Sequence, residues 1–145
     1  MNTPKINGIL FDNKTSRKID VNLFVRVRDL LLSNQEMSSQ DQVSVLLVED
    51  ETIAILNQKF LGRTGKTDVI SFPCDFPEIN FLGDIIIDIQ VADLQKGMRS
   101  LETELQFLFL HGILHLLGYD HLGSFKQNQM KEKENYYQTH IMRFS

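Results

Sequence analysis

The sequence predicts an α+β fold, in which a small mixed β-sheet is covered mainly by helices. Two observations support this class. Apolar, β-branched runs alternate with segments whose apolar residues recur at helical spacing. One long segment, residues 101–117, is apolar on nearly every side, which is typical of a helix buried in a core. The 145 residues contain no repeat, low-complexity run or linker-like stretch, so we expect a single domain over residues 1–145.

Strands are expected where β-branched and apolar residues cluster, and helices where apolar residues recur every three or four positions. Asp20 and Asp50 are candidate helix N-caps, because their side chains can accept hydrogen bonds from the first turn. In order, the expected elements of the first half are a strand over 6–11, a helix over 21–33, a strand over 43–48, a helix from Asp50 to about Phe60 and a polar, glycine-bearing loop over 62–67.

The second half contains clear end signals. Pro73 ends a strand, Ser100 is a candidate N-cap, and Gly118 supplies the left-handed residue that commonly ends a helix. In order, the expected elements are a strand over 69–72, a connector over 75–80, a strand over 82–89, a helix over 91–96, the apolar helix over 101–117 and a last helix from about 127 to 141.

Composition excludes several classes of protein. The single cysteine, Cys74, cannot form an intrachain disulfide, which fits a reducing compartment. The N-terminus lacks the apolar region of a signal peptide, and the apolar stretch 105–117 is too short to span a bilayer. We therefore expect a cytoplasmic protein that has no membrane segment. The net charge of −4 argues against a broad affinity for nucleic acid but leaves room for a local basic patch.

Three of the four histidines lie within eleven residues, at His111, His115 and His121. The first two are four apart, so both rings project from one face of a helix. Gly118 then lets the chain turn back and bring His121 toward the same point. Three imidazoles that hold one zinc ion leave a fourth position open, which is the pattern of a catalytic site. Other divalent transition metals, such as nickel, copper, cobalt or iron, also suit three imidazoles.

The spacing of four and then six residues between the histidines matches that of metzincin proteases. Those enzymes carry a glutamate directly after the first histidine, as the general base. Here that position is Gly112. Without this carboxylate, peptide hydrolysis by the usual protease route is disfavoured, and the pattern points to another kind of metal-dependent hydrolase.

Four segments together resemble the YbeY family of bacterial endoribonucleases. Residues 111–121 read HGILHLLGYDH and match the family pattern H-G-x-L-H-L-x-G-Y-D-H at every fixed position. Residues 67–73 read TDVISFP, where the family has T-D-V-L-S-F-P. Leu-Gly-Asp-Ile at 82–85 and the weaker Leu-Asn at 56–57 are further matches. These motifs occur in the family's order from the middle of the chain to the histidines.

The resemblance implies a zinc-dependent, single-strand-specific endoribonuclease that acts in rRNA maturation and ribosome quality control. It implies an α+β fold with a small mixed sheet, and it makes His111, His115 and His121 the metal ligands and the catalytic centre. The partners that it implies are single-stranded RNA, rRNA precursors, and the ribosome or ribosomal proteins.

The chain departs from the family pattern at two places near the polar loop. Family members usually carry Tyr-Arg where this chain has Phe60-Leu61, and proline where it has Lys66. The resemblance implies that this arginine helps to hold RNA or its phosphate in other family members. Arg63 and Lys66 are the cations of this loop, and we assign them as candidate RNA contacts.

Metal-bound histidines usually donate their second ring nitrogen to a carboxylate or carbonyl group. Asp68 and Asp120 are candidates for this supporting role, since the first follows the polar loop and the second adjoins His121. Asp84 is a third candidate, because a charged residue is unexpected inside a strand.

Two chemical routes to RNA cleavage remain open. Attack by a metal-activated water would leave a 5′-phosphate, and attack by the RNA's own 2′-hydroxyl would leave a 2′,3′-cyclic phosphate.

Two other functions also remain open. A metallopeptidase or amidase would need a base such as Asp68 or Asp84 near the metal. A ribosome-associated binding protein with structural zinc would need a fourth ligand, for which Cys74 is the candidate.

Overall fold

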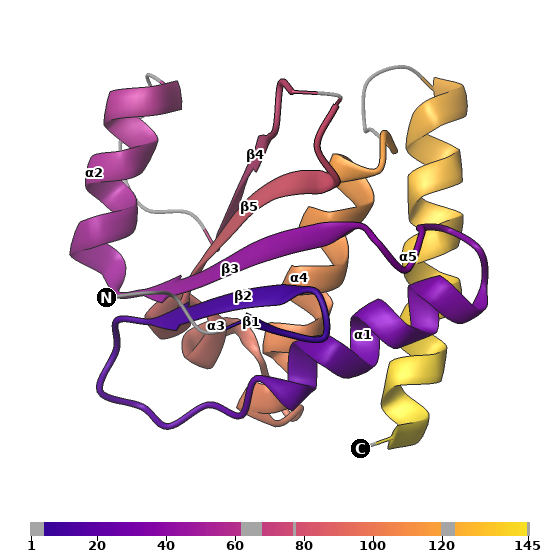
Figure 1. The fold of residues 1–145 in the computed structure, drawn as a ribbon. Helices are drawn as coiled ribbons and strands as arrows, with labels where there is room; N and C mark the ends of the chain where they lie inside the picture. Colours follow the sequence, from indigo (N-terminus) through magenta and orange to yellow (C-terminus); the bar gives the residue numbers. More distant parts are fainter. Residues whose placement is uncertain (1–4, 62–67, 77, 120–123, 145) are drawn as a thin grey trace.

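A computed structural model describes residues 5–61, 68–76, 78–119 and 124–144. Its strands are β1 (Lys5–Ile6), β2 (Ile9–Asn13), β3 (Gln42–Val48), β4 (Val69–Pro73) and β5 (Phe81–Asp88). They form one mixed sheet in the order β1-β2-β3-β5-β4 (Figure 1). The central strands β2, β3 and β5 are parallel, and the edge strands β1 and β4 run antiparallel to their neighbours. This arrangement confirms the predicted α+β class.

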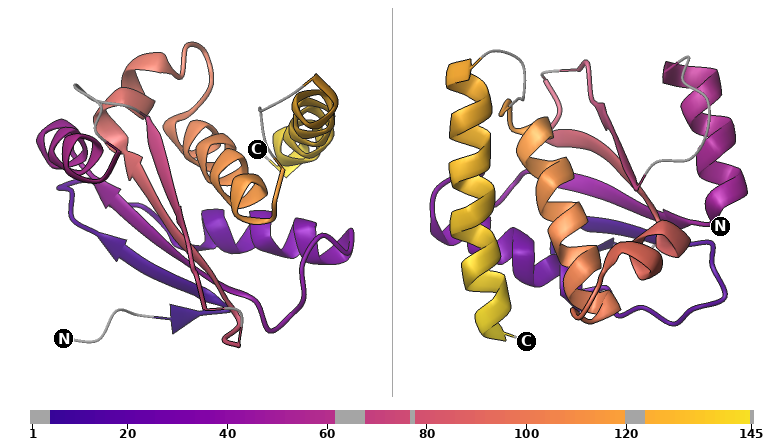
Figure 2. Two further views of the ribbon diagram at one scale, coloured as in Figure 1. Left: turned by 90° about the horizontal axis from the view of Figure 1, so that it is seen from above. Right: turned by 180° about the vertical axis from the view of Figure 1, so that it is seen from behind.

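The helices are α1 (Asn22–Ser33), α2 (Asp50–Leu61), α3 (Ile89–Gln95), α4 (Leu101–Leu116) and α5 (Ser124–Phe144). Figure 2 shows α1, α4 and α5 on one side of the sheet and α2 on the other. α4 packs on the sheet through β4 and β5, and α5 packs on α4. The helix that carries His111 and His115 therefore lies in the middle of the molecule. No helix among the described residues is long and apolar enough to cross a membrane.

The main core fills the space between the sheet, α1 and α4. The α4 side chains that face it are fully buried, and they are Leu105, Phe109, Leu110, Ile113 and Leu114. This confirms the predicted burial of the apolar helix. A second, smaller cluster lies on the α2 side of the sheet and consists of Val48, Ile53, Ile70 and Ile86.

The N-terminal segment was predicted as one strand over 6–11, and this prediction is wrong. Asn7 and Gly8 have φ angles of 47° and 81°, and they join β1 to β2 as a two-residue hairpin. Both central residues of such a turn need positive φ, which asparagine and glycine tolerate best. The Asn-Gly pair in the sequence is itself the signal for this hairpin.

The boundary between β5 and α3 also differs from the expected one. Asp88 ends the strand, and its Oδ1 accepts hydrogen bonds from the backbone N–H groups of Gln90 (2.9 Å) and Val91 (3.2 Å). It is therefore the N-cap of α3, which begins at Ile89 rather than at Val91. The last helix, α5, begins at Ser124, three residues before the predicted start.

Both predicted ends of α4 are confirmed. The Ser100 hydroxyl accepts a hydrogen bond from the Thr103 N–H at 3.1 Å, which caps the first turn. Gly118 has a φ of 103°, and its N–H donates to the His115 carbonyl at 3.0 Å. The Tyr119 N–H donates to the Leu114 carbonyl at 3.0 Å. These two bonds form a Schellman motif, so the backbone after His115 turns in a defined direction.

Candidate metal centre

The two histidines of α4 lie side by side on one helix face. Their ring centroids are 4.7 Å apart, and their ring planes are inclined at 73°. Both residues are partly buried, on a helix whose other faces are packed into the main core. A buried helix holds His111 and His115 at a constant separation, which is what a metal site requires of its ligands.

Gly112 packs directly against the sheet. A Cβ atom at this position would lie 2.9 Å from Ile85 Cγ2 and 3.1 Å from Ser71 Oγ. The Ser71 hydroxyl also donates a long hydrogen bond, 3.4 Å, to the Gly112 carbonyl. The position that holds the general base in metzincin proteases is thus used here for close packing of α4 on β4 and β5, and a glutamate there would displace one of them.

Glu134 of α5 stands directly behind His111. Its Oε1 lies 3.3 Å from His111 Nδ1, and the side chains are 19% and 30% exposed, respectively. A carboxylate that accepts a hydrogen bond from one ring nitrogen of a histidine fixes the orientation of the ring and presents the other nitrogen to a metal. In this geometry Nε2 of His111 is the atom that would bind the metal.

Sequence reasoning missed Glu134, because the Lys and Glu residues of 126–134 look like a solvated helix face. The signal that would have found it is its spacing from the buried residues of the same helix. Met130, Tyr137 and Ile141 are all buried, and Glu134 lies four residues after the first and three before the second. Glu134 therefore lies on the buried face of α5, where a charged side chain needs a hydrogen-bonding or oppositely charged partner.

Asp68 shares a cavity of about 240 Å³ with His111 and Glu134. Its Oδ1 accepts a hydrogen bond from the Val69 N–H (2.8 Å), and its Oδ2 accepts one from Gln95 Nε2 (3.2 Å). Its backbone carbonyl accepts from the Asp88 N–H at 2.9 Å. The structure thus brings Asp68 to the side of the cavity that His111 also lines, where its carboxylate faces the α3 side.

The same cavity is lined by an ion pair between the exposed Arg99 and the buried Glu104. Glu104 is 3% exposed, and its Oε1 accepts hydrogen bonds from the Arg99 guanidinium, one of them from Nε at 3.2 Å. Its Oε2 accepts from Gln95 Nε2 at 2.8 Å. Gln95 therefore bridges Glu104 and Asp68, and the wall of the cavity is a connected polar network.

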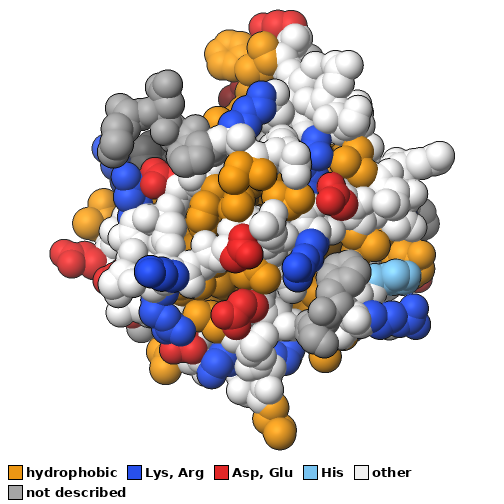
Figure 3. Space-filling model, turned by 60° about the horizontal axis from the view of Figure 1, so that its bottom comes forward, with side chains coloured by type: hydrophobic (Ala, Val, Ile, Leu, Met, Phe, Trp, Pro, Cys, Tyr) orange, Lys and Arg blue, Asp and Glu red, His pale blue; other side chains and the backbone are white. Residues whose placement is uncertain are grey.

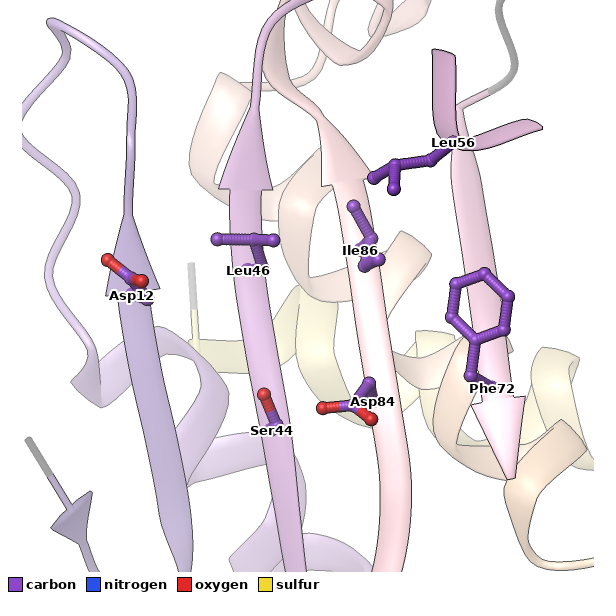
Figure 4. Close-up of a pocket in the computed structure, with 7 residues that line it drawn as sticks. All are labelled: Asp12, Ser44, Leu46, Leu56, Phe72, Asp84 and Ile86. Carbon is purple, nitrogen blue, oxygen red and sulfur yellow. The ribbon is translucent and has the colours of Figure 1, made fainter. Parts of the chain in front are cut away.

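Asp84 does not join the histidines. It lies on the face of the sheet opposite α4, in a pocket of about 290 Å³ with Asp12, Ser44 and Phe72 (Figure 4). Side chains alternate between the two faces of a strand, and the neighbouring Ile85 is the residue that points toward α4. The expected supporting role of Asp84 beside a metal-bound histidine is therefore not met by this geometry.

Four of the predicted site residues lie outside the described residues: Arg63, Lys66, Asp120 and His121. Within the described part of the chain, no group of three His, Cys, Asp or Glu side chains is placed to hold a metal ion. His111 and His115 are thus the two members of the predicted triad whose geometry can be stated.

These two residues fit a zinc ion. Two imidazoles one helical turn apart form the paired ligand set that zinc sites take from a helix, and a carboxylate behind one of them supplies the usual support.

Figure 3 shows that acidic and basic side chains are interspersed around hydrophobic ones on one face of the molecule. Charge on that face is mixed, as the net charge of −4 leads one to expect.

The sequence model of the family described as endoribonuclease YbeY matches residues 10–142. The chain belongs to this family. It is 37% identical to the endoribonuclease YbeY of Nautilia profundicola, and the match covers 86% of each protein. It is 36% identical to that of Helicobacter pylori strain 26695, with 85% of each protein covered.

A solved structure agrees with this assignment. The solution structure of the protein TM1509 from Thermotoga maritima is similar to the present one, with a TM-score of 0.63 and 28% sequence identity. The match covers 92% of this chain and 88% of that protein. The YbeY-type fold therefore extends over almost the whole chain.

Proposed function

We propose that this chain is a zinc-dependent endoribonuclease that cleaves single-stranded RNA during rRNA maturation and ribosome quality control in the cytoplasm. Its substrates would be rRNA precursors, met in contact with the ribosome or its proteins. Membership of the endoribonuclease YbeY family supports this reading. The structural observation that carries it is the adjacent pair His111 and His115, backed by Glu134 on a neighbouring helix.

In this proposal His111, His115 and His121 hold the metal. Bound there, zinc would supply Lewis acidity toward a phosphoryl oxygen and would lower the pKa of a bound water. Glu134 accepts the Nδ1 proton of His111 and keeps the ring oriented toward the metal. Gly112 allows α4 to pack closely on the sheet, and His111, the residue before it, lines the cavity. Arg63 and Lys66 are the proposed phosphate contacts.

The peptidase alternative receives less support from the structure. A peptidase of the metzincin type needs a carboxylate directly after His111, and Gly112 is packed against Ile85 and Ser71. A structural zinc site would need a fourth ligand such as Cys74. The Cys74 thiol follows β4 and lies 4.0 Å from the Phe76 carbonyl oxygen.

The deciding experiment compares zinc content and RNA cleavage in the wild type, in His115→Ala and in His140→Ala. His140 is a matched control, because its Nδ1 lies 2.9 Å from the Tyr136 carbonyl oxygen on α5, away from the histidine pair. We expect about one zinc per chain and cleavage of an unstructured, end-labelled RNA in the wild type and in His140→Ala. Both should be lost in His115→Ala.

The alternative outcomes are distinct. Zinc bound to a wild type that cuts no RNA, alone or with ribosomal subunits, would favour the structural-zinc reading. Cleavage that persists in His115→Ala would show that the histidines are not the catalytic centre. The ends of the products then separate the two routes, since a 5′-phosphate indicates attack by water and a 2′,3′-cyclic phosphate indicates attack by the 2′-hydroxyl.

A further inference from the structure

The largely buried carboxylate of Glu36 joins the chain after α1 to the end of α4 and to α5. Its side chain is 9% exposed. Oε1 accepts a hydrogen bond from the Tyr119 hydroxyl at 2.8 Å, and Oε2 accepts one from the Tyr137 hydroxyl at 2.5 Å. The Lys133 ammonium group also lies 2.8 Å from Oε2. One residue thus connects the chain after α1 with the end of α4 and the middle of α5.

Backbone hydrogen bonds at the end of α1 fix the position of Glu36 independently of its side-chain contacts. Gln35 follows α1 with a φ of 60°, and the Glu36 N–H donates to the Leu31 carbonyl at 2.9 Å. This is the same Schellman geometry that ends α4, where Tyr119 occupies the corresponding position. Glu36 and Tyr119 are therefore equivalent residues of two helix ends, and their side chains bond to each other.

The contacts of the Glu36 carboxylate also shift its pKa. Burial raises the pKa of Glu36, but the hydrogen bonds from Lys133, Tyr137 and Tyr119 outweigh burial and lower it below its ordinary value. Burial, together with the bond to Glu36, raises the pKa of Tyr137, which is 1% exposed. A buried phenol that lost this acceptor would keep its desolvation cost without compensation. The hydrogen-bonding groups of Glu36, Tyr119, Tyr137 and Lys133 are therefore satisfied by one another, and removal of one leaves its partners without that bond.

The residues that contact Glu36 lie close in the sequence to residues of the proposed metal centre. On α5, Lys133 directly precedes Glu134 and Tyr137 comes three residues after it, and Glu134 is the residue that lies against His111. Tyr119 follows the turn whose Gly118 N–H bonds to the His115 carbonyl, and it comes two residues before His121 in the sequence. Glu36 thus contacts both the end of α4 and the stretch of α5 that carries Glu134.

We propose that Glu36 is a positioning residue of the metal centre: it fixes α5 against the end of α4, so that Glu134 stays behind His111. It contacts neither metal nor RNA and acts through Tyr119, Lys133 and Tyr137. The inference rests on the proposed metal site, but its first consequence, the geometry of Glu134 and His111, exists without the metal.

The test uses Glu36→Gln, which keeps the shape of the side chain and removes its charge. Glu132→Gln is the matched control, since Glu132 is an exposed acid on α5 next to Lys133. Zinc affinity is measured by competition with a chromophoric chelator, under conditions where near-ultraviolet circular dichroism shows each variant to be folded. We expect the zinc dissociation constant to rise on the order of 10-fold in Glu36→Gln and to stay unchanged in Glu132→Gln.

A second readout needs no zinc. The 15N chemical shifts of the His111 ring in the metal-free protein report which nitrogen carries the proton. In the wild type we expect the proton on Nδ1, where Glu134 accepts it, and in Glu36→Gln a mixture of the two tautomers. If the wild type binds no zinc but this shift difference appears, the proposed function fails and the positioning role of Glu36 stands.

The result that would overturn the inference is equally specific. A folded Glu36→Gln protein with a lower melting temperature, an unchanged zinc dissociation constant and an unchanged His111 tautomer would show that Glu36 only braces the fold. If Glu36→Gln fails to fold, Tyr119→Phe replaces it, because this variant deletes one hydroxyl group and one hydrogen bond to Glu36. The same two readouts apply to it, with a smaller expected rise in the dissociation constant, of about threefold.

Discussion

On the side of the sheet that α4 covers, buried carboxylates are paired with side-chain donors. On the α2 side, the buried Asp88 carboxylate accepts hydrogen bonds from two backbone N–H groups and lies against the carboxyl group of Asp50. Glu104 is paired with Arg99 and Gln95, and Glu36 accepts hydrogen bonds from two tyrosines and a lysine. Asp88, by contrast, is fully buried at the end of β5. Burial and a neighbouring Asp50 raise its pKa to about 6.

The difference separates a rigid part of the molecule from an adjustable one. Glu36 joins the end of α1 to the end of α4 and to α5, and Glu104 joins α4 to α3, so the helices around His111 are linked by paired polar groups. The α2 side has a smaller apolar cluster, an open pocket and a carboxyl pair whose repulsion changes with protonation. The following predictions test this division, beginning with the largest effect.

Truncation of the main core should cost more stability than truncation of the α2 cluster. Leu110 on α4 and Ile53 on α2 are both fully buried. We expect Leu110→Ala to lower the free energy of unfolding by about 4 kcal/mol and Ile53→Ala by about 2 kcal/mol, because the smaller cluster beside the open pocket can collapse onto a cavity. Urea unfolding measures both values. Equal losses would show that the α2 cluster is as rigid as the main core.

Removal of the Glu134 charge should affect zinc more than folding. Glu134→Gln weakens the acceptor of the His111 Nδ1 proton while it keeps the volume of the side chain. We expect the zinc dissociation constant to rise about 10- to 100-fold, which corresponds to about 1.4–2.7 kcal/mol. Chelator competition measures this, with Glu132→Gln as the control. A Glu134→Gln protein that binds zinc as the wild type does would remove Glu134 from the centre.

The pH dependence of stability should have opposite signs in the two regions. The folded pKa of Asp88, about 6, lies above its ordinary value of 3.8, so the folded state retains a proton that the unfolded state has lost. Its contribution to stability is present below about pH 4 and disappears as the pH rises to about 6. The pKa of Glu36 is lowered, so its contribution is present above its ordinary value of 4.5 and disappears as the pH falls.

We therefore expect the Asp88 contribution to the unfolding free energy of the metal-free protein to decrease by on the order of 2 kcal/mol between about pH 4 and 6. Asp50→Asn removes the neighbouring charge and leaves the Asp88 cap of α3 intact, so it should reduce that decrease. Urea unfolding at a series of pH values measures this, and exposed Asp75→Asn is the control. If the unfolding free energy of Asp50→Asn depends on pH as that of the wild type does, burial alone raises the pKa of Asp88.

The fold was predictable where local signals decide it. The burial of α4 follows from its apolar residues on all sides, and both of its ends follow from Ser100 and Gly118. The hairpin at Asn7 and Gly8 was equally visible, but the apolar residues around it were read as one strand. Cap residues such as Asp88 are harder to predict from the sequence, because a carboxylate at the end of an apolar run is compatible with the end of a strand or with the start of a helix.

The site was predictable only in part, because its partners come from distant segments. The four-residue spacing predicted that His111 and His115 share a face, and the rings are 4.7 Å apart. Glu134 lies against His111, and Glu36 lies against Lys133, because of how α5 packs on α4 and on the end of α1. No local sequence pattern encodes this packing. Asp84 shows the reverse case. Its position inside a strand was unusual, but which face it points to depends on the register of β5 with its neighbours.

The register of β5 leads to the smallest predicted effect. Asp84 faces the open pocket on the α2 side, across the sheet from the histidines (Figure 4). We expect Asp84→Asn to leave the zinc dissociation constant unchanged and to alter the free energy of unfolding by less than about 0.5 kcal/mol, because the residue is exposed. Chelator competition and urea unfolding measure both values beside Glu134→Gln. A loss of zinc affinity equal to that in Glu134→Gln would mean that the two faces of the sheet are coupled, and the division between a rigid side and an adjustable side would no longer hold.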